Sequence, residues 1–288
     1  MSKTKVLIVT QEMSPYTVAS EISEIARRLP QHIQEQGMEI RILMPKFGTI
    51  NERRHRLHEV VRLSGMNIIV DDDDFPLIIK VASVQGARMQ VYFLDNEDFF
   101  KRKAIFEDAD GKAFEDNPDR MIFFCKGVIE TVKKFGWAPD IVHCHGWMTS
   151  LMPLYLKTAY KSEPLFQDAK IITSAYFNQV ANTFSDDFIT KASINNLEAS
   201  DLASFKKEEG ISLLNGAIAF SDAVIIGSEG YEDDAIDNAE KVGKPVLEHQ
   251  SPENYLAAYV NFYKSLLCLL YTSPSPRDAT LSRMPSSA

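Results

Sequence analysis

This sequence has few cysteines, no long apolar run and no excess of positive charge. Its three cysteines, Cys125, Cys144 and Cys268, are too few and too scattered for a disulfide framework. No apolar stretch reaches the ~20 residues that a membrane-spanning helix needs, and no signal-peptide pattern precedes the first predicted strand. Basic side chains number 31 and acidic ones 40, and the resulting net charge of −9 argues against a nucleic acid or an anionic membrane as a partner. We therefore expect a cytoplasmic protein.

Two further absences narrow the chemistry. The first predicted strand is not followed by Gly-x-Gly-x-x-Gly, the spacing of a dinucleotide site, so a nicotinamide oxidoreductase is disfavoured. His143 and His145 are two apart on a predicted strand and share a face, but a metal ion needs a third ligand and Cys144 points the opposite way. The sequence therefore predicts neither a cofactor nor a metal site.

The first 45 residues have the pattern of a βαβ unit. A β-branched, apolar run spans Lys5–Thr10, as in a strand buried on both faces. Apolar residues then recur at helical spacing from residue 22 to residue 33, and Gly37 provides a stop. Residues 40–44 form the next predicted strand, which Pro45 closes. Because such units are right-handed and pair their strands in parallel, we expect a parallel sheet.

The period changes between residues 60 and 95. Short β-type runs at 60–63, 66–70, 77–83 and 89–94 are separated by turn residues, which predicts a β-meander inserted near 60–95 and returning to the main sheet. Four aspartates at 71–74 lie between two of these runs. They could bind a cation, but consecutive carboxylates repel one another and no spaced ligand pattern surrounds them, so a solvated turn is favoured.

The remainder of the chain alternates helices and strands. Helices are predicted at residues 120–134, within 199–220 and at 253–270, and strands at Ile141–His145, at 171–174 and within 221–228. This alternation predicts a single α/β domain over residues 1–267, with a Rossmann-like, doubly wound and mostly parallel sheet. Residues 268–288 are rich in serine and proline and low in apolar content, so we expect a disordered or non-native tail there.

Several motifs occur in the order in which glycogen and starch synthases carry them. Residues 14–30 match the segment after the first strand of those enzymes at Pro15, at the aromatic Tyr16 and at Leu29-Pro30. Further matches are residues 36–45, Asp116-Asn117, Arg120, residues 123–126, residues 139–145 and residues 153–156. Over roughly residues 3–265 the chain therefore resembles glycosyltransferase family 5, the glycogen and starch synthases.

This resemblance implies a fold and a reaction. Family members pair two Rossmann-like domains around an active-site cleft, the GT-B architecture, and the chain resembles the N-terminal half. They transfer glucose, with retention, from ADP-glucose or UDP-glucose to the non-reducing end of an α-1,4-glucan without a metal. We therefore expect a nucleotide sugar, with ADP-glucose favoured, and an α-glucan as ligands. A separate protein partner that supplies a donor domain is also compatible with the resemblance.

Functional positions of the family carry other residues here. The lysine that faces the donor phosphates corresponds to Val18, and two glycines that let backbone N–H groups approach the ligand correspond to Ser20 and Glu21. The His-Asp-Trp motif becomes His145-Gly146-Trp147 and loses its carboxylate. The histidine that contacts the transferred sugar corresponds to Tyr176. These replacements remove a cation and a carboxylate from the expected site.

Polar residues that follow predicted strands make up the candidate site, because open α/β sheets bind ligands at the carboxyl ends of their strands. The resemblance implies catalytic roles for Tyr176, His145 and Glu21, and substrate binding by Thr17, Ser20, Trp147 and Asn178. Structural alternatives exist. Ser20 can cap the following helix, Glu21 can interact with the dipole of that helix, and Trp147 can belong to the core.

Two functions remain open from the sequence. The first is a glycogen- or starch-synthase-type glucosyltransferase that binds its donor without the family lysine, through Arg27, Lys46 or another chain. The second is a catalytically degenerate module that binds glucan or depends on a partner. The resemblance favours the first function. A single domain supplies little of the charge stabilisation that sugar transfer from a diphosphate requires, which argues against turnover by the isolated chain.

Overall fold

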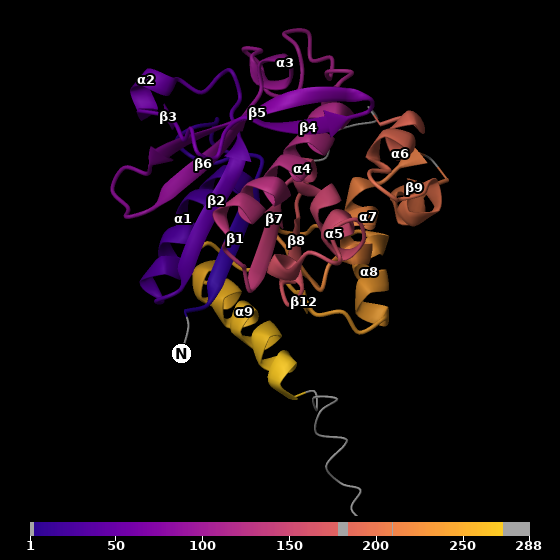
Figure 1. Ribbon diagram of the computed structural model, residues 1–288. Coiled ribbons are helices and arrows are strands. Elements are labelled where there is room, and N and C mark those ends of the chain that lie inside the picture. Colours follow the sequence, from indigo (N-terminus) through magenta and orange to yellow (C-terminus); the bar gives the residue numbers. More distant parts are fainter. Residues whose placement is uncertain (1–2, 178–183, 209, 273–288) are drawn as a thin grey trace, which may run out of the picture.

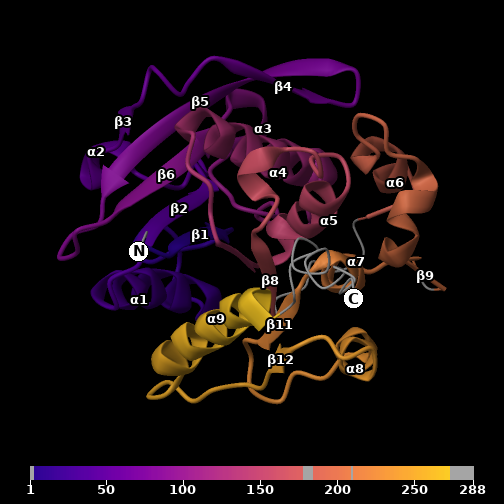
Figure 2. The same cartoon turned by 60° about the horizontal axis from the view of Figure 1, so that its bottom comes forward.

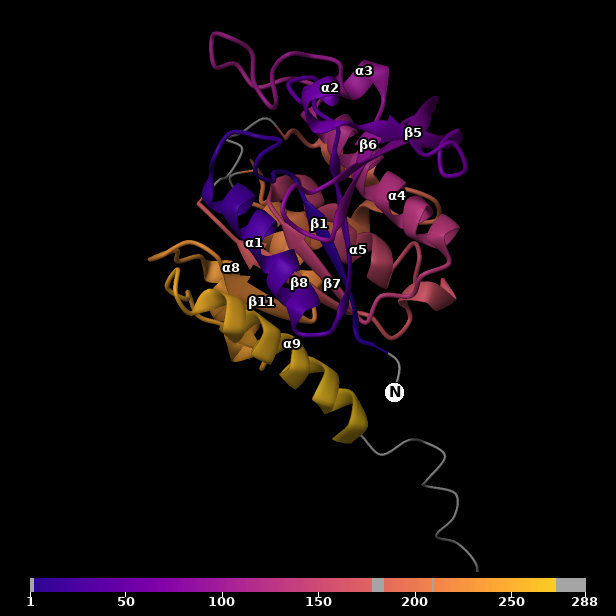
Figure 3. The same cartoon turned by 90° about the vertical axis from the view of Figure 1, so that its left-hand side faces the viewer.

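The computed structural model of the chain describes residues 3–177, 184–208 and 210–272, and the statements below concern these residues (Figure 1). A ten-stranded sheet forms the centre, with helices on both of its faces (Figure 3). In this part of the chain no helix is long and apolar enough to cross a membrane.

Most strands of this sheet run parallel. The order is β12-β11-β8-β7-β1-β2-β6-β5-β3, and β4 pairs with β5. The parallel strands are β1 (Lys5–Thr10), β2 (Glu39–Pro45), β6 (Gln90–Asp95), β7 (Ile141–His145), β8 (Lys170–Ala175), β11 (Ala223–Ile226) and β12 (Val246–Leu247). β1 lies between β2 and β7, and the chain winds outward from it in both directions, so the topological switch point lies between β1 and β7. The predicted doubly wound, mostly parallel α/β fold is confirmed.

Helix α1 (Glu21–Glu35) joins β1 to β2 and completes the predicted βαβ unit. Its apolar face is buried at Ile22, Ile25, Ala26, Leu29 and Ile33. Ser20 caps the helix, as its alternative interpretation predicted. Its Oγ accepts from the Ser23 backbone N–H at 3.0 Å, and the Ser23 hydroxyl oxygen accepts from the Ser20 N–H at 2.8 Å. Gly37 follows the helix at φ +83°, a conformation that glycine adopts without strain.

The predicted meander is also confirmed. β5 (Asp73–Ser83) pairs antiparallel with β6, which returns to the main sheet beside β2. β3 (His58–Glu59) and β4 (Met66–Val70) add to β5. Of the four aspartates at 71–74, the first two form the turn, with Asp71 at φ +56°, and the last two begin β5; all four are exposed.

One strand of the meander was predicted wrongly. Residues 60–63 form a turn rather than a strand, with the Leu63 N–H donating to the Val60 carbonyl at 2.9 Å. Ser64 stabilises this turn, since its hydroxyl donates to the same carbonyl at 3.2 Å and accepts from the Ile79 N–H at 3.0 Å. Val61 is 78% exposed while Leu63 is 1% exposed, so only part of this apolar run is buried.

Helices α1 and α9 (Tyr255–Thr272) lie on one face of the sheet, and α4 (Asn117–Phe135) and α5 (Leu151–Lys157) lie on the other (Figures 2 and 3). The shorter elements are α2 (Glu52–His55), α3 (Glu97–Phe100), α6 (Asp187–Ala192), α7 (Leu213–Phe220), α8 (Asp234–Lys241) and the hairpin of β9 (Lys206–Lys207) and β10 (Gly210–Ile211). A 3₁₀ turn, this hairpin and α7 therefore occupy the region predicted as one or two helices. Residues 273–288, most of the predicted tail, lie outside the described residues.

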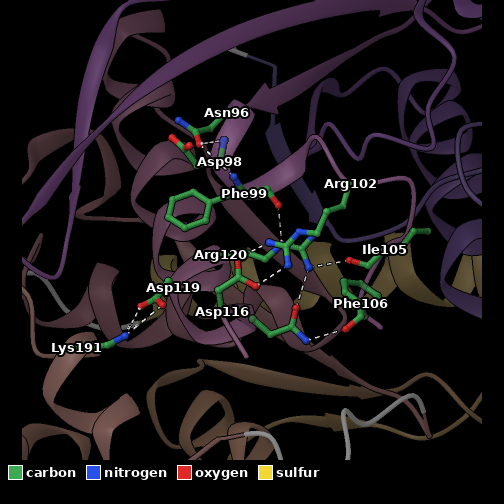
Figure 4. A network of polar contacts seen from close by, with 11 residues as sticks. Asn96, Asp98, Phe99, Arg102, Ile105, Phe106, Asp116, Asp119, Arg120 and Lys191 are labelled. Atoms are coloured by element: carbon green, nitrogen blue, oxygen red, sulfur yellow. Dashed lines mark hydrogen bonds and ion pairs between the residues drawn. The ribbon is translucent and has the colours of Figure 1, made fainter. Parts of the chain in front are cut away.

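A buried guanidinium fixes the loop between α3 and α4 (Figure 4). Arg120, on α4, is fully buried, and its Nε donates to the Phe99 carbonyl at 2.8 Å. Its Nη1 donates to the Ile105 carbonyl and to Asn117 Oδ1, both at 2.7 Å. Burial, followed by the charge of Arg102, lowers the pKa of Arg120 to about 10, so the side chain remains a cation at neutral pH.

The same loop is tied to two other parts of the fold. Arg102 forms an ion pair with Asp116, and Lys103 Nζ donates to the Gly48 carbonyl at 2.7 Å. The ring of Phe106 contacts Trp147 edge-on, with centroids 4.9 Å apart. Arg120 thereby joins α4 to a loop that reaches the ends of β2 and β7.

We expect Arg120→Met to lower the free energy of unfolding by about 3 kcal/mol, because two buried carbonyl oxygens lose their donor while the packed volume stays similar. Urea unfolding followed by circular dichroism measures this change. Lys112→Ala, which removes an exposed ion pair with Glu115, should leave the urea midpoint unchanged. Equal midpoints for Arg120→Met and the wild type would show that the hydrogen bonds of Arg120 contribute nothing to stability.

Candidate active site

The candidate site lies at the carboxyl ends of the parallel strands, around the switch point between β1 and β7. Four segments leave the strands here: residues 11–20 after β1, residues 146–147 after β7, residues 176–177 after β8 and residues 227–228 after β11. The sequence-predicted site residues that the structure describes come from the first three of these segments, from the last residue of β7 and from the start of α1.

Two histidines on β7 form the buried part of the site. His143 hydrogen-bonds through Nδ1 to the Tyr263 hydroxyl of α9 at 2.6 Å, and through Nε2 to Ser174 Oγ of β8 at 2.7 Å. His145 hydrogen-bonds through Nδ1 to the Tyr176 hydroxyl at 2.8 Å. Both rings face the same side of the sheet, with centroids 3.8 Å apart. His145 Nε2 is buried and has no hydrogen-bond partner among the described residues.

The histidine network is electrically neutral. Burial lowers the pKa of His145 to about 3, and burial together with the neighbouring His145 lowers the pKa of His143 well below its ordinary value. Burial also raises the pKa of Tyr176, with Glu21 among the nearby groups that add to the effect. At pH 7 these side chains can therefore donate and accept hydrogen bonds but cannot neutralise a phosphate.

Tyr176 and Glu21 meet at the turn after β11. The Tyr176 ring packs on Gly227 so closely that a Cβ there would lie 2.2 Å from its Cε1 atom. The next residue, Ser228, accepts from the Phe177 N–H at 3.2 Å and donates from its hydroxyl to Glu21 Oε2. The structure thus brings together Tyr176, His145 and Glu21, the three residues with predicted catalytic roles, from the segment after β8, from β7 and from α1.

The two predicted substrate-binding residues before α1 have hydrogen bonds of their own. Thr17 is partly exposed, and its Oγ1 accepts from the Met13 N–H at 3.1 Å. The Ser20 hydroxyl donates to Glu12 Oε2 while it caps α1. Ser20 is therefore available to a ligand only in competition with Glu12.

Glu12 is a site residue that the sequence reasoning missed. Glu12 is almost fully buried two residues after the end of β1, where its Oε1 accepts from Gln11 Nε2 at 2.9 Å and its Oε2 accepts from Ser20. The sequence position of Glu12 could have identified it, because a carboxylate just beyond a strand buried on both faces lies where a parallel sheet binds its ligands.

Trp147 stands apart from this group. Trp147 is 6% exposed, and its ring meets Phe106 and Phe184 edge-on, with centroids 4.9 and 5.8 Å away. This is the position in the core that its structural alternative described. Asn178 lies outside the described residues.

A family model described as the starch synthase catalytic domain matches residues 5–246 of the chain. The chain belongs to this family. A glycogen synthase from Chlorobium limicola is 35% identical over 81% of the chain and 47% of its own length, and one from Pelodictyon phaeoclathratiforme is 33% identical over 86% and 51%. The chain therefore spans about half the length of these curated relatives.

A solved structure shares the fold. The catalytic domain of starch synthase IV from Arabidopsis thaliana, bound to ADP and acarbose, matches with a TM-score of 0.72 over 87% of this chain and 52% of its own. At 19% sequence identity this match supports the architecture, one half of a GT-B-type protein, and leaves the ligands of this chain open.

The site has no room for an aspartate in place of Gly146, the position where the family resemblance implies a carboxylate. This glycine has φ +87°, and a Cβ added there would lie 2.3 Å from the Gln11 side chain. Gln11 is held in that place because its Oε1 accepts from the Met148 N–H at 3.2 Å. The glycine and the buried glutamine therefore form one arrangement, at the position where the family resemblance implies an aspartate.

The cations that the sequence suggested as substitutes for the family lysine are engaged elsewhere. Lys46 Nζ lies 2.6 Å from Glu52 Oε1, and Arg27 donates to Gln31 Oε1 and to the Gln85 carbonyl, both at 3.1 Å. Val18, at the position of the family lysine, is 80% exposed. Among the described residues no cluster of three or more His, Cys, Asp or Glu side chains is arranged to bind a metal ion.

The two buried histidines should make the protein acid-labile. Their folded-state pKa values lie below the ordinary value of 6.5, so they add stability above pH 6.5 and lose it as the pH falls toward the folded values. Each contributes a slope of up to about 1.4 kcal/mol per pH unit below 6.5.

Urea unfolding at pH 7.5, 6.0 and 5.0 measures this slope, and His145→Gln should make it shallower than in the wild type. The exposed His58 provides the control, because His58→Gln should leave the slope unchanged. Identical slopes for all three proteins would contradict the neutral, buried state of His145.

Proposed function

We propose that the chain is a glycogen- or starch-synthase-type glucosyltransferase, which transfers glucose from a nucleotide sugar, preferably ADP-glucose, to an α-1,4-glucan. The observation that carries the proposal is the convergence of His145, Tyr176 and Glu21 at the carboxyl edge of the sheet, in a member of the starch synthase family. The ADP and acarbose bound to the related starch synthase IV domain agree with a nucleotide and a glucan as ligand classes.

The chemistry of these residues suits a sugar better than a phosphate. His145 and Tyr176 are neutral, and their hydrogen-bonding groups match sugar hydroxyls. Thr17, Ser20 and Glu21 are the members of the site that reach solvent, so we expect the sugar to lie against the turn before α1. Tyr176 and His145 are buried beneath this turn, so we expect them to hold it in position for the sugar.

A second candidate function is a partner-dependent or glucan-binding module without activity of its own. Two large apolar side chains, Val18 and Phe177, are 80% and 63% exposed at the edge that carries the site. The cations suggested by the sequence are engaged in other contacts. A separate protein that covers this edge and supplies the donor domain would account for both observations.

Titration calorimetry of the full chain with ADP-glucose, UDP-glucose and maltoheptaose, followed by a labelled-glucose transfer assay, tests the proposal. We expect ADP-glucose to bind more tightly than UDP-glucose, and glucose to appear on the maltoheptaose. Binding of maltoheptaose without binding of either donor would refute the transferase and support the module.

Tyr176→Phe should lower the rate of glucose transfer at least about tenfold, because the loss of one hydrogen bond at the site corresponds to roughly 1.4 kcal/mol. The steady-state rate with saturating ADP-glucose is the measurement, alongside a thermal unfolding curve. Tyr92→Phe removes a hydroxyl that donates to Gln90 on β6, away from the site, and should transfer glucose at the wild-type rate. A full rate in Tyr176→Phe would remove this tyrosine from the site.

A further inference from the structure

A group of basic side chains stands out in this acidic chain. Residues 52–62 hold Arg53, Arg54, Arg56 and Arg62, all of them exposed, in a protein with a net charge of −9. We call Arg53, Arg54 and Arg56 the arginine cluster. They lie on α2 and on the residue that ends it. The site described above makes no use of them.

The arginine cluster lies at the same edge of the sheet as the candidate site. α2 follows the carboxyl end of β2 after a short loop, and Figures 1 and 3 show it at the end of the sheet where β1 and β2 terminate. His55 of α2 packs edge-on against Tyr16, with ring centroids 4.9 Å apart. Tyr16 precedes Val18, the position of the family lysine, by two residues, so the cluster borders the loop that lacks this cation.

The charges of the cluster are not neutralised within the described residues. None of the ion pairs there involves the guanidinium groups of Arg53, Arg54 or Arg56. The carboxylate nearest in sequence, Glu52, is bound by Lys46 at 2.6 Å and by Lys80 at 2.8 Å. Three neighbouring cations thus remain available to a mobile anion.

The backbone at Arg56 gives a second reason to assign a role to its side chain. Arg56 ends α2 in the left-handed conformation, at φ +54° and ψ +44°. Glycine is the usual residue there, and a residue with a Cβ is less stable in this conformation by roughly 1 kcal/mol. Basic side chains at the end of a helix can also be explained by attraction to the helix dipole. This explanation is weak here, because α2 has four residues and therefore only a small dipole.

We propose that Arg53, Arg54 and Arg56 form an anion site that binds the diphosphate group of the nucleotide sugar, in place of the family lysine. The identity of the ligand rests on the proposed function. Guanidinium groups bind phosphate oxygens through two parallel N–H···O bonds and retain their charge at every physiological pH. The cluster supplies the cations that the neutral His145–Tyr176 pair and the engaged Arg27 and Lys46 do not.

The test uses titration calorimetry of the full chain with ADP, inorganic pyrophosphate, glucose 1-phosphate and maltoheptaose. ADP and pyrophosphate should bind, with affinities that fall as salt rises, and glucose 1-phosphate should bind more weakly because it carries one phosphate. Arg53→Gln and Arg54→Gln should each weaken ADP binding about fivefold to tenfold and leave maltoheptaose binding unchanged.

Arg56→Gly separates a binding role from a structural one. Glycine relieves the left-handed backbone, so this variant should unfold at a higher urea concentration than the wild type while its affinity for ADP falls about fivefold. Arg88→Gln is the matched control. It makes the same change of charge at an exposed residue before β6, at the opposite edge of the sheet, and should bind ADP as the wild type does.

The outcomes distinguish the site from the proposed function. Wild-type ADP affinity in the cluster variants, or an equal loss in Arg88→Gln, would overturn the anion site. Glucose 1-phosphate binding as tightly as pyrophosphate would overturn its assignment to a diphosphate. If ADP binds through the cluster but no glucose is transferred, the anion site stands and the transferase proposal fails; if glucose is transferred and the variants keep full donor affinity, only the anion site fails.

Discussion

Two histidines on the central strand β7 have no access to solvent, and their need for hydrogen bonds determines how the neighbouring segments are joined. His143 is held from β8 by Ser174 and from α9 by Tyr263, and His145 is held by Tyr176 beyond the end of β8. These bonds connect segments that are far apart in sequence, and they position Tyr176 against Gly227. Through the turn after β11 the arrangement extends to Glu21 on α1. The candidate site is thus the outer end of a buried polar network.

The electrostatics of the site follow from this burial. A histidine that cannot reach water stays neutral, so the strand that carries the family's histidines contributes hydrogen bonds and no positive charge. The carboxylates of Glu12 and Glu21 make the region around the turn before α1 acidic. A phosphate-bearing ligand therefore needs cations from another segment of the chain or from a partner. The arginine cluster after β2 lies at this edge, and its side chains form no ion pair within the described part of the chain.

The sequence predicted the sheet and its connections well because those depend on local pattern. A run of apolar residues such as Lys5–Thr10 has few stable alternatives to a buried strand, and the helical spacing from residue 22 to residue 33 specifies which face of α1 is buried. Residues 60–63 show the limit of this reasoning. Their composition is that of a strand, but the hydroxyl of Ser64 and its contacts to Val60 and Ile79 stabilise a turn instead.

The candidate site was predictable only in part, because local patterns do not specify contacts between distant segments. Its position at the ends of β1, β7 and β8 follows from the parallel topology, and its residues follow from the family resemblance. The contacts within it do not. Trp147 contacts Phe106 and Phe184, each about 40 residues away in sequence, and Gly146 makes room for Gln11, which is 135 residues away. Glu12, which no motif marked, is likewise a site residue because Ser20 folds back onto it.

By itself the sequence determined the fold class, the order of most elements and the family, since each depends on periodicity or on motifs that are read locally. The tertiary structure alone decided which polar groups lose water, which cations are paired and which remain free. Those properties depend on neighbours that are distant in sequence, as with Lys80, which binds Glu52 from a strand of the meander. A pairing or a pKa shift arises from the three-dimensional surroundings of a side chain, and the linear pattern does not contain them.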